Sequence, residues 1–177
     1  MGVLMSKPDD EKQQGGKPRS KAKGTKGKGK GIFAKRNIKK GETIVVAKGK
    51  VYTIQNYKKD VKKYRLDEDH LLQIDFDKFI LGKNIARFTN HSCSPNARIK
   101  DRVKFVALRN IKKDEEITLD YDTFEYGSGW TMKCKCGSKN CRKIVKGFRF
   151  LPEKLKKKYI KTGMVSDYLL KISPNEK

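Results

Sequence analysis

A chain of 177 residues with 36% charged side chains and a formal net charge of +24 at pH 7 has the length of one domain with tails. Its mean hydropathy is −0.81, and its apolar runs are too short to cross a bilayer, which excludes a membrane protein. Met1–Glu11 lacks the apolar core of a signal peptide, so we expect an intracellular protein with no membrane partner.

The positive charge is unevenly distributed along the chain. Between Asp67 and Glu125 there are 12 acidic and 10 basic residues, so the remainder of the chain carries the whole excess. Basic flanks suit a polyanion and predict non-specific contact with nucleic acid. A mildly acidic middle tolerates a lysine-rich substrate that a basic cleft would repel.

Residues 1–24 are predicted to form a disordered basic tail, because Lys, Gly, Gln and Ser dominate and large apolar side chains are almost absent after Met5. The simplest interpretation is a solubilising or nucleic-acid-binding tail. An alternative is that four lysines spaced among small residues are themselves methylated: Lys21, Lys23, Lys26 and Lys28.

The middle of the chain alternates between turn signals and short strand patterns, which indicates a β-rich core. Two glycines in Gly29–Phe33 predict a loop that allows close backbone approach. A turn over Ala34–Glu42 is echoed in sequence by Arg109–Glu115. Residues 56–65 are a short helix or a loop, and strands are predicted over 43–47, 50–54, 69–75, 77–81, 98–107 and 116–121.

The C-terminal part predicts a helical cap over residues 151–177. Pro152 starts a helix that runs to Lys161, and Gly163 stops it. Apolar residues then recur at helical spacing from Val165 to Ile172, which predicts a second short helix. The cap is expected to pack on the core, although binding of a partner helix is an alternative.

The four cysteines suggest a single metal site. Cys134, Cys136 and Cys141 form a C-x-C-x4-C pattern, and Cys93 is the remaining thiol. Neighbouring C-x-C thiols are poorly placed to pair, and an intracellular setting disfavours disulfides. One tetrahedral Zn²⁺ would use all four thiolates and leave no open position, so the site would be structural. A zinc knuckle for nucleic acid and two unrelated buried pairs are the alternatives.

Four segments occur in an order that resembles one family. They are Gly29-Lys-Gly-Ile-Phe33, Arg87-Phe-Thr-Asn-His-Ser-Cys-Ser-Pro-Asn96, Asp114-Glu-Glu-Ile-Thr-Leu-Asp-Tyr121 and Cys134-Lys-Cys-Gly-Ser-Lys-Asn-Cys141. Each is weak alone, but together they resemble SET-domain protein lysine methyltransferases with a post-SET zinc segment. The resemblance implies a mainly β SET-domain fold of small twisted sheets with a pseudoknot over residues 25–125, and a post-SET segment over 126–150.

The resemblance also implies a function, the transfer of a methyl group from S-adenosylmethionine to a lysine of a histone-like or other basic protein. Tyr121 takes the catalytic place and orients the lysine amine. The implied cofactor-binding residues are Gly29, Lys30, Gly31, Phe33, Arg87, Asn90 and His91, and the zinc ligands are Cys93, Cys134, Cys136 and Cys141. His91 as a general base is a less favoured alternative.

Two positions depart from the family pattern. Ala47 stands where many members have Tyr, so a wall of the lysine channel differs, and Leu119 stands where many have Phe or Tyr. A catalytically dead SET reader is therefore one alternative function. A non-enzymatic, zinc-containing nucleic-acid module is another. We expect a monomer that is cytoplasmic or nucleoid-bound if prokaryotic, with the nucleus or delivery as an effector into a host as the other options.

Overall fold

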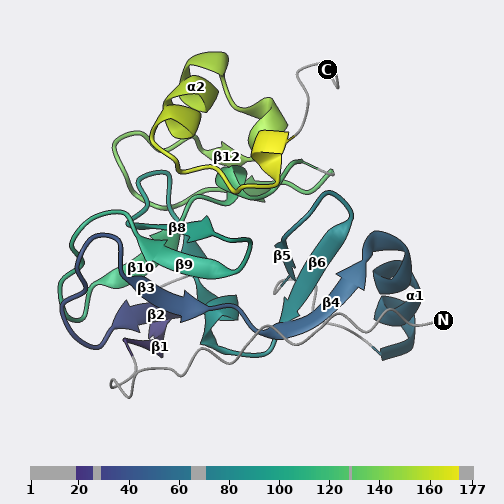
Figure 1. Ribbon diagram of the computed structural model, residues 1–177, viewed down its shortest axis with the longest axis horizontal. Coiled ribbons are helices and arrows are strands. Elements are labelled where there is room, and N and C mark those ends of the chain that lie inside the picture. Colours follow the sequence, from purple (N-terminus) through teal and green to yellow (C-terminus); the bar gives the residue numbers. More distant parts are fainter. Residues whose placement is uncertain (1–18, 26–28, 65–70, 128, 172–177) are drawn as a thin grey trace.

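The computed structural model describes residues 19–25, 29–64, 71–127 and 129–171, and every structural statement concerns these ranges. Short strands dominate, as predicted, and the two α-helices lie far apart, α2 at the top of the view and α1 at its right edge (Figure 1). In the described part of the chain, neither helix is long and apolar enough to span a membrane. The strands are β1 Ser20–Thr25, β2 Gly29–Ala34, β3 Thr43–Val46, β4 Gly49–Thr53, β5 Leu71–Gln73, β6 Lys78–Gly82, β7 Asn90–His91, β8 Ala97–Lys100, β9 Lys104–Ala107, β10 Glu116–Leu119, β11 Met132–Lys133 and β12 Ile144–Val145; the helices are α1 Ile54–Tyr64 and α2 Glu153–Lys161.

The strands form four small sheets, and one of them assembles the functional segments. Its strand order is β1-β2-β10-β7, with β10 antiparallel to β2 and parallel to β7. Thr118 lies opposite Asn90 and Leu119 lies opposite His91. The other sheets have the orders β3-β9-β8, β4-β6-β5 and β11-β12. Strand β10 therefore places the Asn-His pair next to the end of the strand that carries Tyr121.

The main core lies between the first sheet and the β3-β9-β8 sheet. In β10 the side chains of Ile117 and Leu119 are buried while their neighbours are partly exposed, the period of two that one buried sheet face requires. Ile32 from β2 and Ile99 from β8 join the same cluster. These strands are short, so their stability depends on this shared apolar core rather than on strand length.

The two turns with matching sequences dock against each other. Ile38 and Ile111 pair as a β-bridge at the centre. The Asn37 side chain accepts a hydrogen bond from the Lys113 amide at 2.9 Å, and Asn110 accepts one from the Lys40 amide at 2.9 Å. This reciprocal pattern satisfies the backbone donors of both turns and fixes the chain entering β3 and β10.

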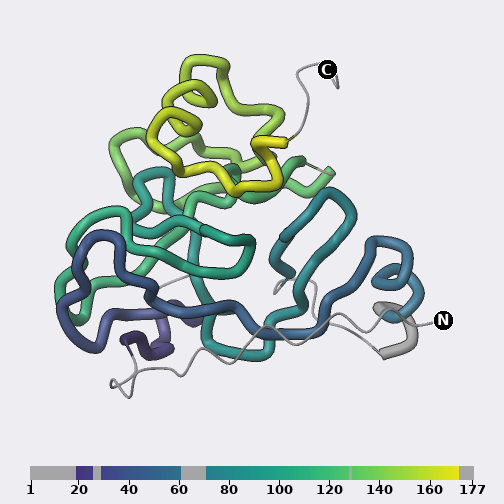
Figure 2. Tube along the Cα trace, in the orientation of Figure 1, coloured from purple at the N-terminus to yellow at the C-terminus, as the bar shows by residue number. Residues whose placement is uncertain are grey.

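The C-terminal segment packs as a cap above the sheets (Figure 2). Tyr159 of α2, Val165, Tyr168 and Leu169 form a separate apolar cluster. The Tyr168 hydroxyl donates a hydrogen bond to the Phe124 carbonyl at 2.5 Å, which ties the cap to the chain after β10. The second short helix predicted over residues 165–172 is present as a 3-10 helix, Leu169–Lys171, and is shorter than the apolar spacing indicates.

Three further predictions differ from the structure. Gly29–Phe33 is strand β2 rather than a loop, because β1 and β10 pair with both of its edges. Ser20–Gly24, predicted as tail, form most of β1, since backbone pairing with β2 does not require apolar side chains. Residues 98–107 form the hairpin β8-β9, because positive φ values of 49° at Asp101 and 65° at Arg102 turn the chain. Residues 1–18 lie outside the described ranges.

Candidate active site and zinc-ligand cluster

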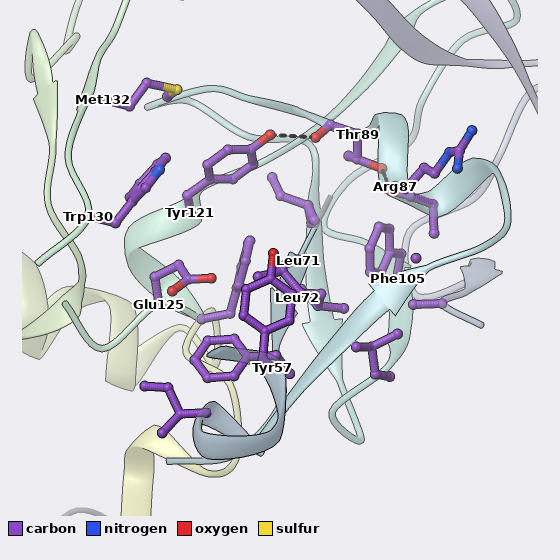
Figure 3. A pocket seen from close by; sticks show the side chains of 18 of the residues that line it. Tyr57, Leu71, Leu72, Arg87, Thr89, Phe105, Tyr121, Glu125, Trp130 and Met132 are labelled. Carbon is purple, nitrogen blue, oxygen red and sulfur yellow. Dashed lines mark hydrogen bonds between the residues drawn. The ribbon is translucent and has the colours of Figure 1, made fainter. Parts of the chain in front are cut away.

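Tyr121 stands at the edge of a pocket of about 540 Å³ (Figure 3). The residue follows β10 and opens the 3-10 turn Tyr121–Thr123. Its hydroxyl donates a hydrogen bond to the Thr89 carbonyl at 2.7 Å. Burial raises the pKa of the phenol, and the charges of Glu125 and Glu116 add to the rise. The phenol is therefore neutral at physiological pH: its O–H points to the Thr89 carbonyl, and its oxygen lone pairs are available.

The pocket walls are mostly apolar and come from the β4-β6-β5 sheet, α1 and the core strands. Ala47 and Leu119, the two positions that depart from the family pattern, both line the pocket. Glu125 is the acidic residue of the lining. Burial raises the pKa of its carboxyl group to about 8, and the charge of Asp122 adds to the rise. A hydrogen bond from the backbone N–H of Gln73 lowers the pKa, but by less. An aliphatic chain that ends in a nitrogen matches such walls.

Asn90 connects the predicted cofactor segments. Its side-chain amide donates to Glu116 Oε1 at 2.7 Å and to the Lys30 carbonyl at 3.2 Å. Gly31 allows this approach, because a Cβ at this position would lie 2.9 Å from Asn90 Nδ2 and 2.7 Å from Glu116 Oε1. The structure thus brings Lys30 and Gly31 against Asn90 in a closely packed cradle, in which a side chain at position 31 would clash.

The predicted cofactor segments also carry aromatic and cationic side chains. The Phe88 ring is flanked by Lys30 Nζ at 5.2 Å and by the Arg87 guanidinium at 4.5 Å. Phe33 lies two residues after Gly31 on β2, and Lys23 Nζ lies 5.5 Å from its ring. Polar main chain, an amide, cations and aromatic faces suit a nucleoside joined to an amino acid, so these residues fit S-adenosylmethionine.

His91 is buried, with its side chain 2% exposed. Its Nδ1 accepts a hydrogen bond from the Tyr121 amide at 3.2 Å, and its Nε2 lies 3.3 Å from Cys93 Sγ. The ring also contacts the Tyr121 ring edge-on at 5.3 Å between centroids. Both nitrogens are engaged, so the arrangement supports a structural role for the imidazole and disfavours its use as a general base.

The four cysteines meet at one place, with all Sγ atoms within 4.8 Å of one another. Cys93 Sγ and Cys134 Sγ are 3.8 Å apart. Tetrahedral Zn–S bonds of about 2.3 Å place two sulfurs about 3.8 Å apart, so the cluster fits one zinc ion. Burial raises the pKa of the Cys93 thiol strongly, and that of Cys134 to about 11. A bound cation would hold these groups as thiolates.

Several residues at this site were not identified from the sequence. Thr89 accepts the Tyr121 hydroxyl, and Glu125 enters the pocket. Arg142 forms ion pairs with Asp120 and Asp122 on both sides of Tyr121. The only sequence signal was the carboxylate on either side of the tyrosine together with an arginine directly after a cysteine.

The aromatic residues near the cysteines separate into two groups. Trp130 lines the pocket, and its ring centroid is 6.1 Å from that of Tyr121. Phe148 packs against the C-terminal cluster. Phe150 is exposed and lies beneath the Arg149 guanidinium. Only Trp130 of these three lies at the candidate active site.

A comparison with known families matches residues 29–122, more than half of the chain, to the SET domain. The chain therefore belongs to the SET-domain family. The crystal structure of the methyltransferase domain of human Histone-lysine N-methyltransferase SETMAR superposes with a TM-score of 0.56 and 22% identity, over 70% of this chain and 56% of that one. This likeness concerns the fold, and it confirms the mainly β SET-domain architecture.

Curated relatives are similar over the same region. The "Histone-lysine N-methyltransferase, H3 lysine-36 specific" of Debaryomyces hansenii is 34% identical over 133 residues, which cover 68% of this chain and 18% of the relative. The "Histone-lysine N-methyltransferase, H3 lysine-4 specific" of Schizosaccharomyces pombe is 34% identical over 125 residues, 63% of this chain and 13% of the relative. The chain thus spans less than a fifth of the length of either relative.

Proposed function

We propose that this SET domain is an S-adenosylmethionine-dependent protein-lysine N-methyltransferase. The observation that carries the proposal is the Tyr121 hydroxyl, which stands at an apolar pocket and is fixed by its hydrogen bond to Thr89. The cradle of Gly31 and Asn90 comes from β2 and β7, which pair with the two edges of β10, and Tyr121 lies two residues after the end of β10. An apolar pocket with an oriented hydroxyl suits a lysine side chain better than it suits a nucleic-acid base or phosphate.

The residues of the chain act mainly by desolvation and alignment. When bound, S-adenosylmethionine supplies a methyl group that is already activated. A free lysine amine has a pKa of about 10.4, and burial between apolar walls lowers that pKa and favours the neutral nucleophile. The Tyr121 hydroxyl donates its proton in the hydrogen bond to the Thr89 carbonyl. The lone pairs of the Tyr121 oxygen therefore accept a hydrogen bond from the lysine amine, which directs the nitrogen lone pair toward the methyl group.

We infer that the substrate is a histone or another basic chromatin protein. The curated relatives are named histone-lysine methyltransferases, specific for H3 lysine-36 or H3 lysine-4. The basic flanks of this chain would hold the enzyme near DNA, while its mildly acidic middle accepts a lysine-rich tail. We therefore infer that the enzyme acts on nuclear chromatin, rather than in a nucleoid or as an effector delivered into a host.

Transfer of tritium from labelled S-adenosylmethionine to histone octamers tests the proposal, with Tyr121→Phe as the catalytic control. We expect transfer by the wild type and its loss in the variant, while DNA binding is unchanged in both. DNA binding without any transfer by the wild type would favour the nucleic-acid module. Calorimetric binding of S-adenosylmethionine without turnover would identify a reader that has lost activity.

A further inference from the structure

Two buried carboxylates flank Tyr121 on the side of the chain away from the pocket. Asp120 is 1% exposed and Asp122 is 2% exposed, and neither lines the pocket. Asp120 Oδ1 accepts a hydrogen bond from the Asp122 amide at 3.2 Å, so the pair also shapes the turn that carries the tyrosine. Two neighbouring buried charges of the same sign are unstable without a counter-ion.

One guanidinium contacts both carboxylates. Arg142 Nη2 lies 2.5 Å from Asp120 Oδ1 and 2.7 Å from Asp122 Oδ2. Nη1 donates to the second oxygen of Asp120 at 2.8 Å, and Nε donates to Asp122 Oδ2 at 3.1 Å. The side chain is only 15% exposed. A planar guanidinium can satisfy two carboxylates in this way, whereas a lysine ammonium cannot span both with the same geometry.

The position of Arg142 is in turn fixed by the cysteine cluster. It directly follows Cys141, and its amide donates to Cys93 Sγ at 3.3 Å. The same segment supplies the Lys146 and Gly147 amides, which donate to Asp122 Oδ1 at 3.0 and 2.6 Å. From the cap, the Tyr159 hydroxyl donates to Asp120 Oδ2 at 2.9 Å. The cysteine segment and α2 therefore both reach the carboxylates beside Tyr121.

We propose that Arg142 is a positioning residue for the methyl transfer: by bridging Asp120 and Asp122 it sets the backbone turn of Tyr121 and so the direction of its hydroxyl. The inference rests on the proposed function and assigns part of its machinery to the segment after the cysteines. The tyrosine is thereby held from two sides, by Thr89 at its hydroxyl and by Arg142 through the flanking carboxylates. A displacement of about 1 Å at a reacting group can lower a rate about 100-fold.

The test compares two variants. Arg142→Lys keeps the positive charge but loses the planar guanidinium that contacts both carboxylates, and Lys139→Arg is the reverse exchange at an exposed position of the same segment. We expect Arg142→Lys to lower kcat about 100-fold. Its KM for S-adenosylmethionine should stay within about threefold of the wild type, with one zinc retained per chain. Trp130, the single tryptophan, lies 6.1 Å from Tyr121, so its emission should shift in Arg142→Lys and not in Lys139→Arg.

Zinc content and thermal unfolding separate positioning from loss of structure. Unchanged kcat and Trp130 emission in folded Arg142→Lys would overturn the proposal, as would a fall in kcat that tracks loss of zinc. If Arg142→Lys does not fold, Tyr159→Phe removes one hydrogen bond to Asp120, and we expect a smaller fall in kcat with the same emission shift. If the wild type transfers no methyl group, the proposed function fails, while the emission of Trp130 still tests the positioning.

Discussion

Replacement of Gly31 by alanine tests the proposed cofactor cradle directly. The added Cβ would lie 2.7 Å from Glu116 Oε1, 2.8 Å from Thr25 Cγ2 and 2.9 Å from Asn90 Nδ2. These neighbours are the ends of side chains, so they can move without unfolding the sheet. Asn90 would then lose its hydrogen bonds to Glu116 and to the Lys30 carbonyl.

The size of the effect follows from those two hydrogen bonds. Each contributes about 1 kcal/mol, so about 2 kcal/mol of the placement of Asn90 is lost. Since 1.4 kcal/mol is a factor of ten, we expect the Kd for S-adenosylhomocysteine to rise about 30-fold. The fold should survive, because Gly31 does not have a positive φ and an alanine can adopt its backbone conformation.

Isothermal titration calorimetry with S-adenosylhomocysteine measures the change, with Gly24→Ala as the matched control. Gly24 lies on the neighbouring strand β1, opposite Lys30, and a Cβ there meets no atom within 4 Å. We expect Gly24→Ala to bind as the wild type does. Equal Kd values for the two variants would refute the assignment of Gly31 and Asn90 to the cofactor site.

Three further results are expected. Tyr121→Phe should lower transfer about 100-fold or more, while losing only about 1 kcal/mol of unfolding free energy at Thr89, as urea denaturation would show. Removal of zinc by a chelator, or Cys141→Ser, should lower the Tm and change the emission of Trp130, because the cysteine segment loses its anchor. The pKa of Glu125 rises from 4.5 to about 8 on folding, so the folded state retains its proton longer and stability falls between pH 4.5 and 8. Glu125→Gln should remove that fall, at most about 5 kcal/mol, when urea midpoints at pH 5 and pH 8 are compared.

The sequence predicted those features that depend on local patterns. Strand alternation located β10, proline and glycine bounded α2, and the spacing of the cysteines anticipated that they meet. The two turns with similar sequences, 34–42 and 109–115, contact each other through the side chains of Asn37 and Asn110. Zinc binding and the roles of the cofactor residues remain predictions.

Other features arise only in three dimensions. No local pattern shows that Arg142 will reach Asp120 and Asp122, because the ion pairs join residues about 20 positions apart. The turn at Asp101 was missed because a positive φ at a non-glycine residue leaves little signal in the sequence. The sequence of β1 predicts a tail rather than a strand, because its side chains are mostly polar and its hydrogen bonds come from the backbone of β2.

The strand order β1-β2-β10-β7 has a consequence for the order of events during synthesis. The hairpin β1-β2 is made first, but a lone two-stranded hairpin is marginally stable in water. Its partner β10 begins at residue 116, and ribosomes add about 5–20 residues per second. The hairpin is therefore without its partner strand for several seconds during synthesis. The β4-β6-β5 unit with α1 is contiguous in the chain and can collapse during that interval. The sheet that carries the candidate active site therefore closes only after β10 is made, and refolding should be limited by that long-range step.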